Sequence, residues 1–220
     1  MRRATPALFD ALRSVTRRIV LYSADLPNSF ATLSAHGVAF LNVKDDNDEV
    51  FFVDDLAHQC GHIMFNALTQ EKARFLARTA DTPLRDFCRD REDPRTLYSA
   101  FHGLFTFSTI LWILQACVAD RELSDRQRHE ALGRIAFNLN KFAIDSNNLA
   151  TPGLFTSDGR ALYELFEGVY ETVFRAHHGV ARDLDVSDQP YVFDYARFAA
   201  RNPAVREPGM PAAQAAWSAR

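Results

Sequence analysis

Three histidines are the residues of this chain whose type and spacing could do chemistry. His58 and His62 lie four residues apart in the segment DDLAHQCGHIMFNAL, and His102 lies near the start of the uncharged segment YSAFHGLFTFSTILWILQACV. Four residues is slightly more than one helical turn, so His58 and His62 would project from one face of a helix, about 5–6 Å apart at Cβ. That spacing allows both imidazoles to bind one metal ion.

The residue that follows the first histidine excludes one kind of metal chemistry. A zinc peptidase with a His-Glu-x-x-His helix uses the glutamate as its general base. This chain has Gln59 at that position. Because an amide cannot take a proton from water, we expect the histidine pair to hold a metal ion without performing zinc hydrolysis.

The third ligand has more than one candidate. His102 is preferred, because it lies near the beginning of its expected helix and is followed by Gly103, which permits close approach. Asp93, in a loop before a proline, is a second candidate, and a core histidine bonded to a carbonyl is the alternative interpretation of His102. Asp54 shares the face of the histidines but lies two turns from His62, about 12 Å of rise. Asp54 is therefore predicted to be a helix cap.

Composition places the chain among ordinary globular proteins. Its 220 residues suit a single domain over 1–220, with 205–220 as a disordered tail; hydrophobic residues make up 47% and charged residues 24%. A net charge of −3 gives no reason to expect nucleic acid as a partner. The three cysteines, widely spaced and without a C-x-x-C motif, favour a reducing compartment, so we expect a cytoplasmic protein.

The uncharged segment 97–118 is long enough to cross a membrane. Six polar residues interrupt it, and no second segment of this kind follows. We therefore expect a buried helix of a soluble protein and no membrane partner.

The pattern of the remaining chain predicts a mainly α fold with a small β-hairpin or sheet near the N-terminus. A short amphipathic helix is expected over about 5–18. Strand-like composition follows in RRIVLYS, FATLSAHGVAFLNV and EVFFVDD, with Asp54 or Asp55 as the N-cap of the histidine helix. Further helices are expected over 96–119, from Ser124 to about 148, and over 157–178, with an extended chain after Gly179. The apolar side of the last helix would carry Leu162, Leu165, Phe166, Val169, Val173 and Phe174.

Three segments together resemble a known family. HGVAFLNV, DDLAHQCGHIMFNAL and EDPRTLYSAFHGLFTF are similar to the HExxH-motif domain of 2-oxoglutarate-dependent, HExxH-type peptide β-hydroxylases. In that family a His-x-x-x-His helix is followed, thirty to forty residues on, by Asp-Pro-Arg and then by a Leu-His-Gly-like element that opens a helix. The similarity covers roughly 36–112, and LATPGLFTSDGRAL looks like a downstream Leu-Thr-x-x-Gly region. The motifs are short.

The resemblance implies a mononuclear iron(II) oxygenase that uses 2-oxoglutarate to hydroxylate an unactivated carbon, typically Cβ of a residue in a peptide. By matching positions, His58, His62 and His102 would be the iron ligands. Arg95 would pair with the distal carboxylate of 2-oxoglutarate, and Arg134 is the reserve candidate, since arginine suits bidentate carboxylate pairing. Such iron sites usually have two histidines and one carboxylate, so a carboxylate third ligand stays open.

The departure from the family pattern is again Gln59, in place of the usual glutamate. It would disable a hydrolase, whereas an oxygenase needs no protein base at that position. Gln59 could instead orient a ligand or the cosubstrate through its amide.

Two other classes of protein compete with this interpretation. A metal-free or degenerate peptide-binding partner in a biosynthetic pathway would keep the fold and lose the iron. A di-iron carboxylate oxidase would need Glu-x-x-His pairs, and the sequence contains none. We expect a peptide or amino-acid-like substrate; its identity, the carbon attacked and the oligomeric state are left open.

Overall fold

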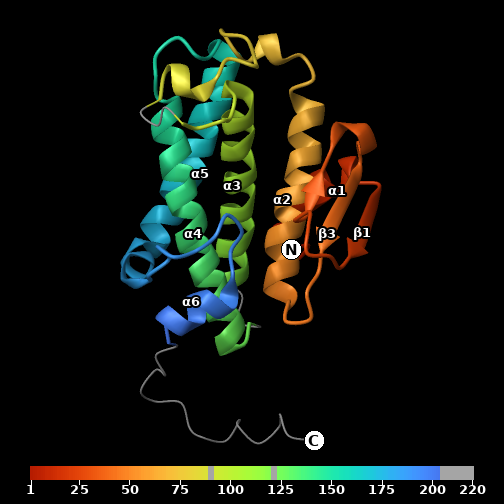
Figure 1. Ribbon diagram of the computed structural model, residues 1–220, viewed down its shortest axis with the longest axis vertical. Coiled ribbons are helices and arrows are strands. Elements are labelled where there is room, and N and C mark those ends of the chain that lie inside the picture. The colour runs from red at the N-terminus through yellow and green to blue at the C-terminus, as the bar shows by residue number, and fades with distance from the viewer. Residues whose placement is uncertain (89–91, 120–122, 204–220) are drawn as a thin grey trace, which may run out of the picture.

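The computed structural model describes residues 1–88, 92–119 and 123–203. Its elements follow one another as α1 (Pro6–Val15), β1 (Arg18–Tyr22), β2 (Phe30–Ala31), β3 (Val38–Asn42), α2 (Glu49–Leu68), α3 (Leu97–Ala119), α4 (Asp125–Leu149), α5 (Ser157–Asp183) and α6 (Tyr195–Arg201). The mainly α fold with a small sheet near the N-terminus is therefore confirmed (Figure 1). The tail predicted over 205–220 lies outside the described residues.

The sheet has the strand order β1-β3-β2. β1 and β3 run parallel, in register from Arg18 opposite Val38 onward, and the two-residue β2 pairs antiparallel with β3. The rings of Phe30 and Phe40 stack at a centroid distance of 4.6 Å across that second pair. β2 is thus a short strand at the edge of the sheet, and residues 29–31 lie beside α2.

The strand predicted in EVFFVDD is wrong, because residues 49–55 form the first two turns of α2. The Asp48 side chain accepts a hydrogen bond from the Val50 backbone N–H and so caps the helix six residues before the expected position. Burial of Val50, Asp54 and Ala57 repeats at helical spacing. The prediction of Asp54 or Asp55 as N-cap is wrong for the same reason.

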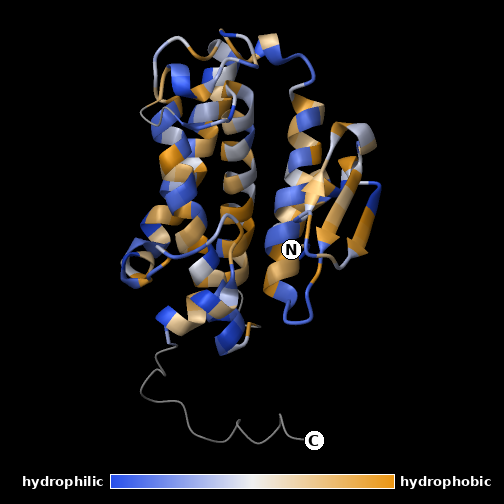
Figure 2. Ribbon diagram, viewed as in Figure 1, coloured by the Kyte–Doolittle hydropathy of each residue, from blue (hydrophilic) through white to orange (hydrophobic). Residues whose placement is uncertain are grey.

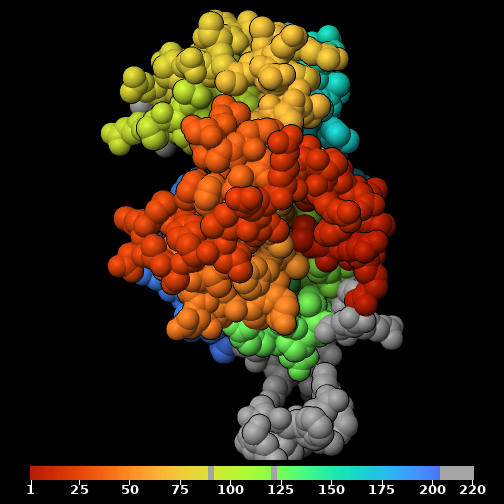
Figure 3. All heavy atoms as spheres, turned by 90° about the vertical axis from the view of Figure 1, so that its right-hand side faces the viewer, coloured from red at the N-terminus to blue at the C-terminus, as the bar shows by residue number. Residues whose placement is uncertain are grey.

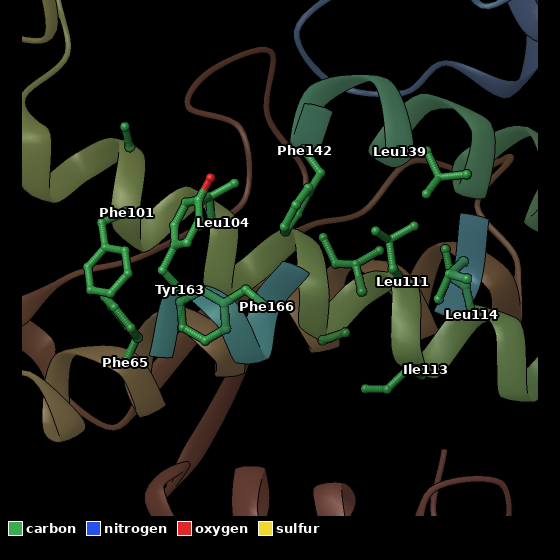
Figure 4. Close-up of a cluster of buried hydrophobic side chains, with 14 of the residues drawn as sticks. Phe65, Phe101, Leu104, Leu111, Ile113, Leu114, Leu139, Phe142, Tyr163 and Phe166 are labelled. Atoms are coloured by element: carbon green, nitrogen blue, oxygen red, sulfur yellow. The ribbon is translucent and has the colours of Figure 1, made fainter. Parts of the chain in front are cut away.

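The central helix α3 packs against α2, α4 and α5. By length and composition it could cross a membrane, but 61% of its most apolar window is buried inside the protein. Figure 4 shows this core, in which Leu104 and Leu111 of α3 and Phe142 of α4 are almost inaccessible to solvent. α3 is therefore the element around which the other long helices are arranged.

The helix α2, which carries His58 and His62, has neighbours on two sides. It contacts α3 on one side and α1, β2 and β3 on the other. Figures 1 and 3 show the N-terminal elements covering the side of α2 that faces away from the bundle. Figure 2 shows hydrophobic residues along the strands that pack there. This double packing fixes the position of α2.

The C-terminal part contains more helix than predicted. α5 continues to Asp183, and α6 follows where an extended chain was expected. The Phe198 ring of α6 lies over Gly133 of α4, where an added Cβ would come within 2.6 Å of the ring. On α5, Phe166 and Val173 are buried as predicted.

Two assignments on that face of α5 are wrong. Leu165 is 62% exposed and Phe174 44% exposed, whereas Tyr163, which the prediction left out, is buried together with Phe166. The buried stripe is therefore narrower than the hydrophobic one.

Candidate functional site

The structure brings together the three histidines singled out in the sequence. His58 and His62 lie on α2, with ring centroids 4.6 Å apart, and His102 on α3 lies 4.6 Å from His62 by the same measure. His62 Nδ1 and His102 Nε2 are 2.9 Å apart, within hydrogen-bonding distance. The cluster therefore joins two helices that are far apart in the sequence.

Aromatic packing holds α2 and α3 in this arrangement. The Phe65 ring lies 4.9 Å from His102 and stacks on Phe105 at the same distance. An added Cβ on Gly61 would contact the Thr106 methyl at 3.5 Å, so the helices approach closely beside His62 and one turn after His102. The rings are thus positioned by packed aromatic side chains and not by a loop.

Burial keeps all three imidazoles neutral at physiological pH. It lowers the pKa of His58 to about 4 and the pKa values of His62 and His102 to about 3. A smaller cause is the repulsion that a protonated ring would meet from Lys141, from Lys72 or from another protonated imidazole of the cluster. The neutral imidazole is the form that binds a metal ion. The electrostatics of the cluster therefore suit a metal ligand set.

The donor chemistry fits a first-row transition metal, since imidazole suits iron, copper and zinc. Two nitrogens bonded at right angles to one ion, each at about 2.1 Å, would be roughly 3.0 Å apart, close to the separation of His62 Nδ1 and His102 Nε2. As the rings stand, these nitrogens share a proton. Within the described ranges no three His, Cys, Asp or Glu side chains have the geometry of a metal site. An ion would therefore have to displace that proton.

The three histidines line a cavity of about 440 Å³ between α2, α3 and α4. Its volume is in the range of small-molecule sites. Charged and amide side chains reach it from α2, α4 and the loop before α3; they include Asp54, Asp55, Gln59, Arg95, Arg134 and Lys141.

Arg134, the reserve candidate for the cosubstrate, is buried in an ion-pair network. Its Nη1 donates to Asp54 Oδ2 at 2.6 Å, and its Nε and Nη2 donate to Glu130 Oε1 at 3.0 and 2.8 Å. Asp54 belongs to α2, whereas Glu130 belongs to α4, the helix that also carries Arg134. The ion pair with Asp54 therefore joins α2 to α4. Asp54 therefore pairs with a buried arginine and, contrary to the sequence prediction, does not cap a helix.

Arg95 is also held by acidic residues of the protein. Its Nη1 and Nη2 donate to the two Asp145 oxygens at 2.8 and 2.7 Å, and its Nε and Nη2 donate to Asp93. These partners raise the pKa of the guanidinium further. Gly103 permits this arrangement, because an added Cβ there would lie 3.2 Å from Asp145 Oδ2. Asp93, the alternative third ligand, is thus engaged by Arg95.

Lys141 is a cavity residue that sequence reasoning missed. Its Nζ lies over the rings of Tyr191 and Phe137, at 4.2 and 4.5 Å from their centroids, and donates to the Tyr191 carbonyl. Burial lowers its pKa to about 8. No ion pair with a carboxylate forms at Lys141 in the described part of the chain. Its position two turns after Arg134 on α4 was the available signal.

Asp55 and Gln59 form a second group that the sequence did not assign together. Gln59 Nε2 donates to Asp55 Oδ1 at 3.1 Å, and Gln59 is only 2% exposed. Gln59 Oε1 and Asp55 Oδ2 are buried without a hydrogen-bond partner. Burial raises the pKa of Asp55 to about 6, although hydrogen bonds from Ser29 and Gln59 oppose this shift.

A comparison of the sequence with models of known protein families finds no match, and a comparison with curated proteins finds no significant similarity. The resemblance to the peptide β-hydroxylases is therefore a prediction that depends on the short motifs quoted above.

Proposed function

We propose that this chain is an iron(II)- and 2-oxoglutarate-dependent hydroxylase of a peptide or amino-acid-like substrate. The observation that carries the proposal is the cluster of three neutral imidazoles from α2 and α3 in one cavity. A hydrolytic role lacks support, because the residue between the histidines is an amide and accepts no proton from water.

His58, His62 and His102 would hold the iron. Bound there, iron(II) would supply oxidative chemistry in which O₂ and 2-oxoglutarate give succinate, CO₂ and a hydroxylated carbon. The protein's part is to bind, orient and shield. Phe107 and Ile110 line the same cavity and give it apolar wall, which limits the access of water to the reacting carbon.

We assign the distal carboxylate of 2-oxoglutarate to Lys141 in preference to Arg95 or Arg134. Both guanidinium groups already direct donors at carboxylates of the protein. The Lys141 ammonium has aromatic rings and one carbonyl as direct neighbours, and Asp54 and Asp145 act on it without forming an ion pair. An incoming anion would give it a counter-ion in direct contact. Its charge also acts on His58, which places it within electrostatic reach of the imidazoles.

The test is anaerobic reconstitution with iron(II), followed by measurement of bound iron and of succinate released in air with 2-oxoglutarate. His62→Ala should abolish both, whereas the matched variant His178→Ala, at an exposed position on α5, should change neither. Wild-type protein that binds no stoichiometric iron would overturn the proposal.

A metal-free peptide-binding protein is the second candidate function. The hydrogen bond between His62 and His102 favours it, because it satisfies both nitrogens without an ion. The same iron measurement separates the two candidates.

A further inference from the structure

Most charged side chains around the cavity form ion pairs with each other, but one cation and one carboxylate do not. Arg134 pairs with Asp54, and Arg95 pairs with Asp145. Of the acids and bases named above, Lys141 is left without a carboxylate and Asp55 without a cation. An ion pair between these two is not formed in the described part of the chain. Asp54 and Asp145 act on Lys141, and Arg134 acts on Asp55, only without direct contact, so a ligand can supply the direct partner that each one lacks.

The site at Asp55 has a defined chemistry. Asp55 and Gln59 lie one helical turn apart on α2, and the hydrogen bond between them uses one oxygen of the carboxylate and the nitrogen of the amide. What remains is a pair of oxygens, Asp55 Oδ2 and Gln59 Oε1, each buried and without a donor. A buried acceptor without a donor is unfavourable. Both residues line the cavity, although the two oxygens themselves are shielded from solvent. A rotation of the carboxylate and of the amide would turn these oxygens toward a group inserted in the cavity, and that group can then provide the donors.

We propose that Asp55 and Gln59 form a recognition site for a primary ammonium group of the substrate. An ammonium carries several donors on one compact atom, and it can therefore serve two oxygens from adjacent turns. Phe30 and Phe51 line the cavity with Asp55 and would contact the alkyl chain that carries the amine.

The ammonium site itself does not depend on the proposed function. The inference rests on that function only where it identifies the bound amine as part of the substrate. With 2-oxoglutarate assigned to Lys141, the substrate is the ligand that reaches Asp55, and His58 lies one turn further along α2. An amine-bearing side chain or a free N-terminus is therefore the substrate feature that the protein selects.

The experiment measures binding of butylammonium, with 1-butanol as its neutral counterpart, to the full-length protein by ligand-observed NMR. We expect butylammonium to bind at least tenfold more tightly than 1-butanol, since hydrogen bonds to charged groups differ from neutral ones by about this factor or more. Asp55→Asn keeps the shape of the side chain and should weaken butylammonium binding about tenfold to a hundredfold. Gln59→Leu should weaken it by a smaller factor.

The control is Asp46→Asn, which makes the same change in net charge at an exposed position and should leave binding unchanged. Equal affinity of the wild type for butylammonium and 1-butanol, or unchanged butylammonium affinity in Asp55→Asn, would overturn the inference. Circular dichroism confirms that each variant is folded. Because binding is measured without turnover, a wild-type protein that releases succinate but shows no preference for butylammonium rejects this inference alone. A wild-type protein that binds butylammonium but no iron rejects the proposed function alone.

Discussion

Replacing Arg134 by methionine would separate a structural role for this arginine from a cosubstrate-binding role. The side chain is 5% exposed, and its partners Asp54 and Glu130 are 12% and 3% exposed. Removing one member of such a buried network leaves charge without compensation and costs about 3–5 kcal/mol. For a domain of this size that lowers Tm by roughly 6–20 °C, and it is a large part of a typical folding free energy of about 5–15 kcal/mol.

Urea unfolding followed by circular dichroism measures this loss. A triple variant that combines Arg134→Met with Asp54→Asn and Glu130→Gln removes the unmatched charges and should recover at least half of the lost stability. A loss below about 1 kcal/mol for Arg134→Met, or no recovery in the triple variant, would refute the reasoning. Lys141→Met should unfold at nearly the wild-type urea concentration, because its ammonium has no carboxylate partner.

Three further predictions concern the cavity and the helix packing. Lys141→Met should raise the 2-oxoglutarate concentration needed for half-maximal succinate release at least tenfold, and Lys72→Met should not. Gly159→Ala should destabilise the fold by several kcal/mol, because the added Cβ would lie 1.8 Å from a backbone carbonyl oxygen; Gly168→Ala, with open space on the same helix, should stabilise it by up to about 1 kcal/mol. Burial raises the pKa of Asp55 to about 6, so its carboxyl group favours the folded state at low pH, and that contribution is lost as pH rises from about 4 through 6. Asp55→Asn should therefore match the wild type near pH 4 and exceed its unfolding free energy by up to about 3 kcal/mol above pH 7.

Each of these has a clear opposite outcome. An unchanged 2-oxoglutarate requirement in Lys141→Met returns the carboxylate to Arg95 or Arg134. Wild-type urea midpoints for Gly159→Ala would show that α5 can shift away from its neighbour. A constant stability difference between Asp55→Asn and the wild type across pH 4–8 would show that this carboxyl group keeps its ordinary pKa when the protein folds.

Sequence patterns identified the helices well where caps and apolar periodicity agree. Ser124 begins α4 as predicted, with a capping box to Gln127, and the helix expected over 96–119 is α3. The segment 49–55 was misassigned, because Val50, Phe51, Phe52 and Val53 have strand propensity that one capping aspartate overrides. Intrinsic preference is weak compared with tertiary packing and a satisfied helix terminus.

The histidine cluster was predictable from spacing, since His58 and His62 share a helix face and His102 lies in the second turn of the central helix α3. Its electrostatic surroundings were not. Asp54 and Arg134 are 80 residues apart in sequence, and no periodicity relates them. Lys141 stands out only once α4 is packed beside α2 and the Tyr191 loop is placed over it. Pairing between distant charges requires the fold.

The position of α2 gives the N-terminal quarter of the chain a role in placing the histidine cluster. Two of the three imidazoles are carried by a helix that is clamped between the bundle and the layer formed by α1 and the sheet. Without residues 1–48 the outer side of that helix would face water, and only its packing against α3 would hold its histidines beside His102. The small sheet therefore supports the outer side of α2. In a shortened protein without it, we expect the three histidines to move apart while α3, α4 and α5 stay packed together.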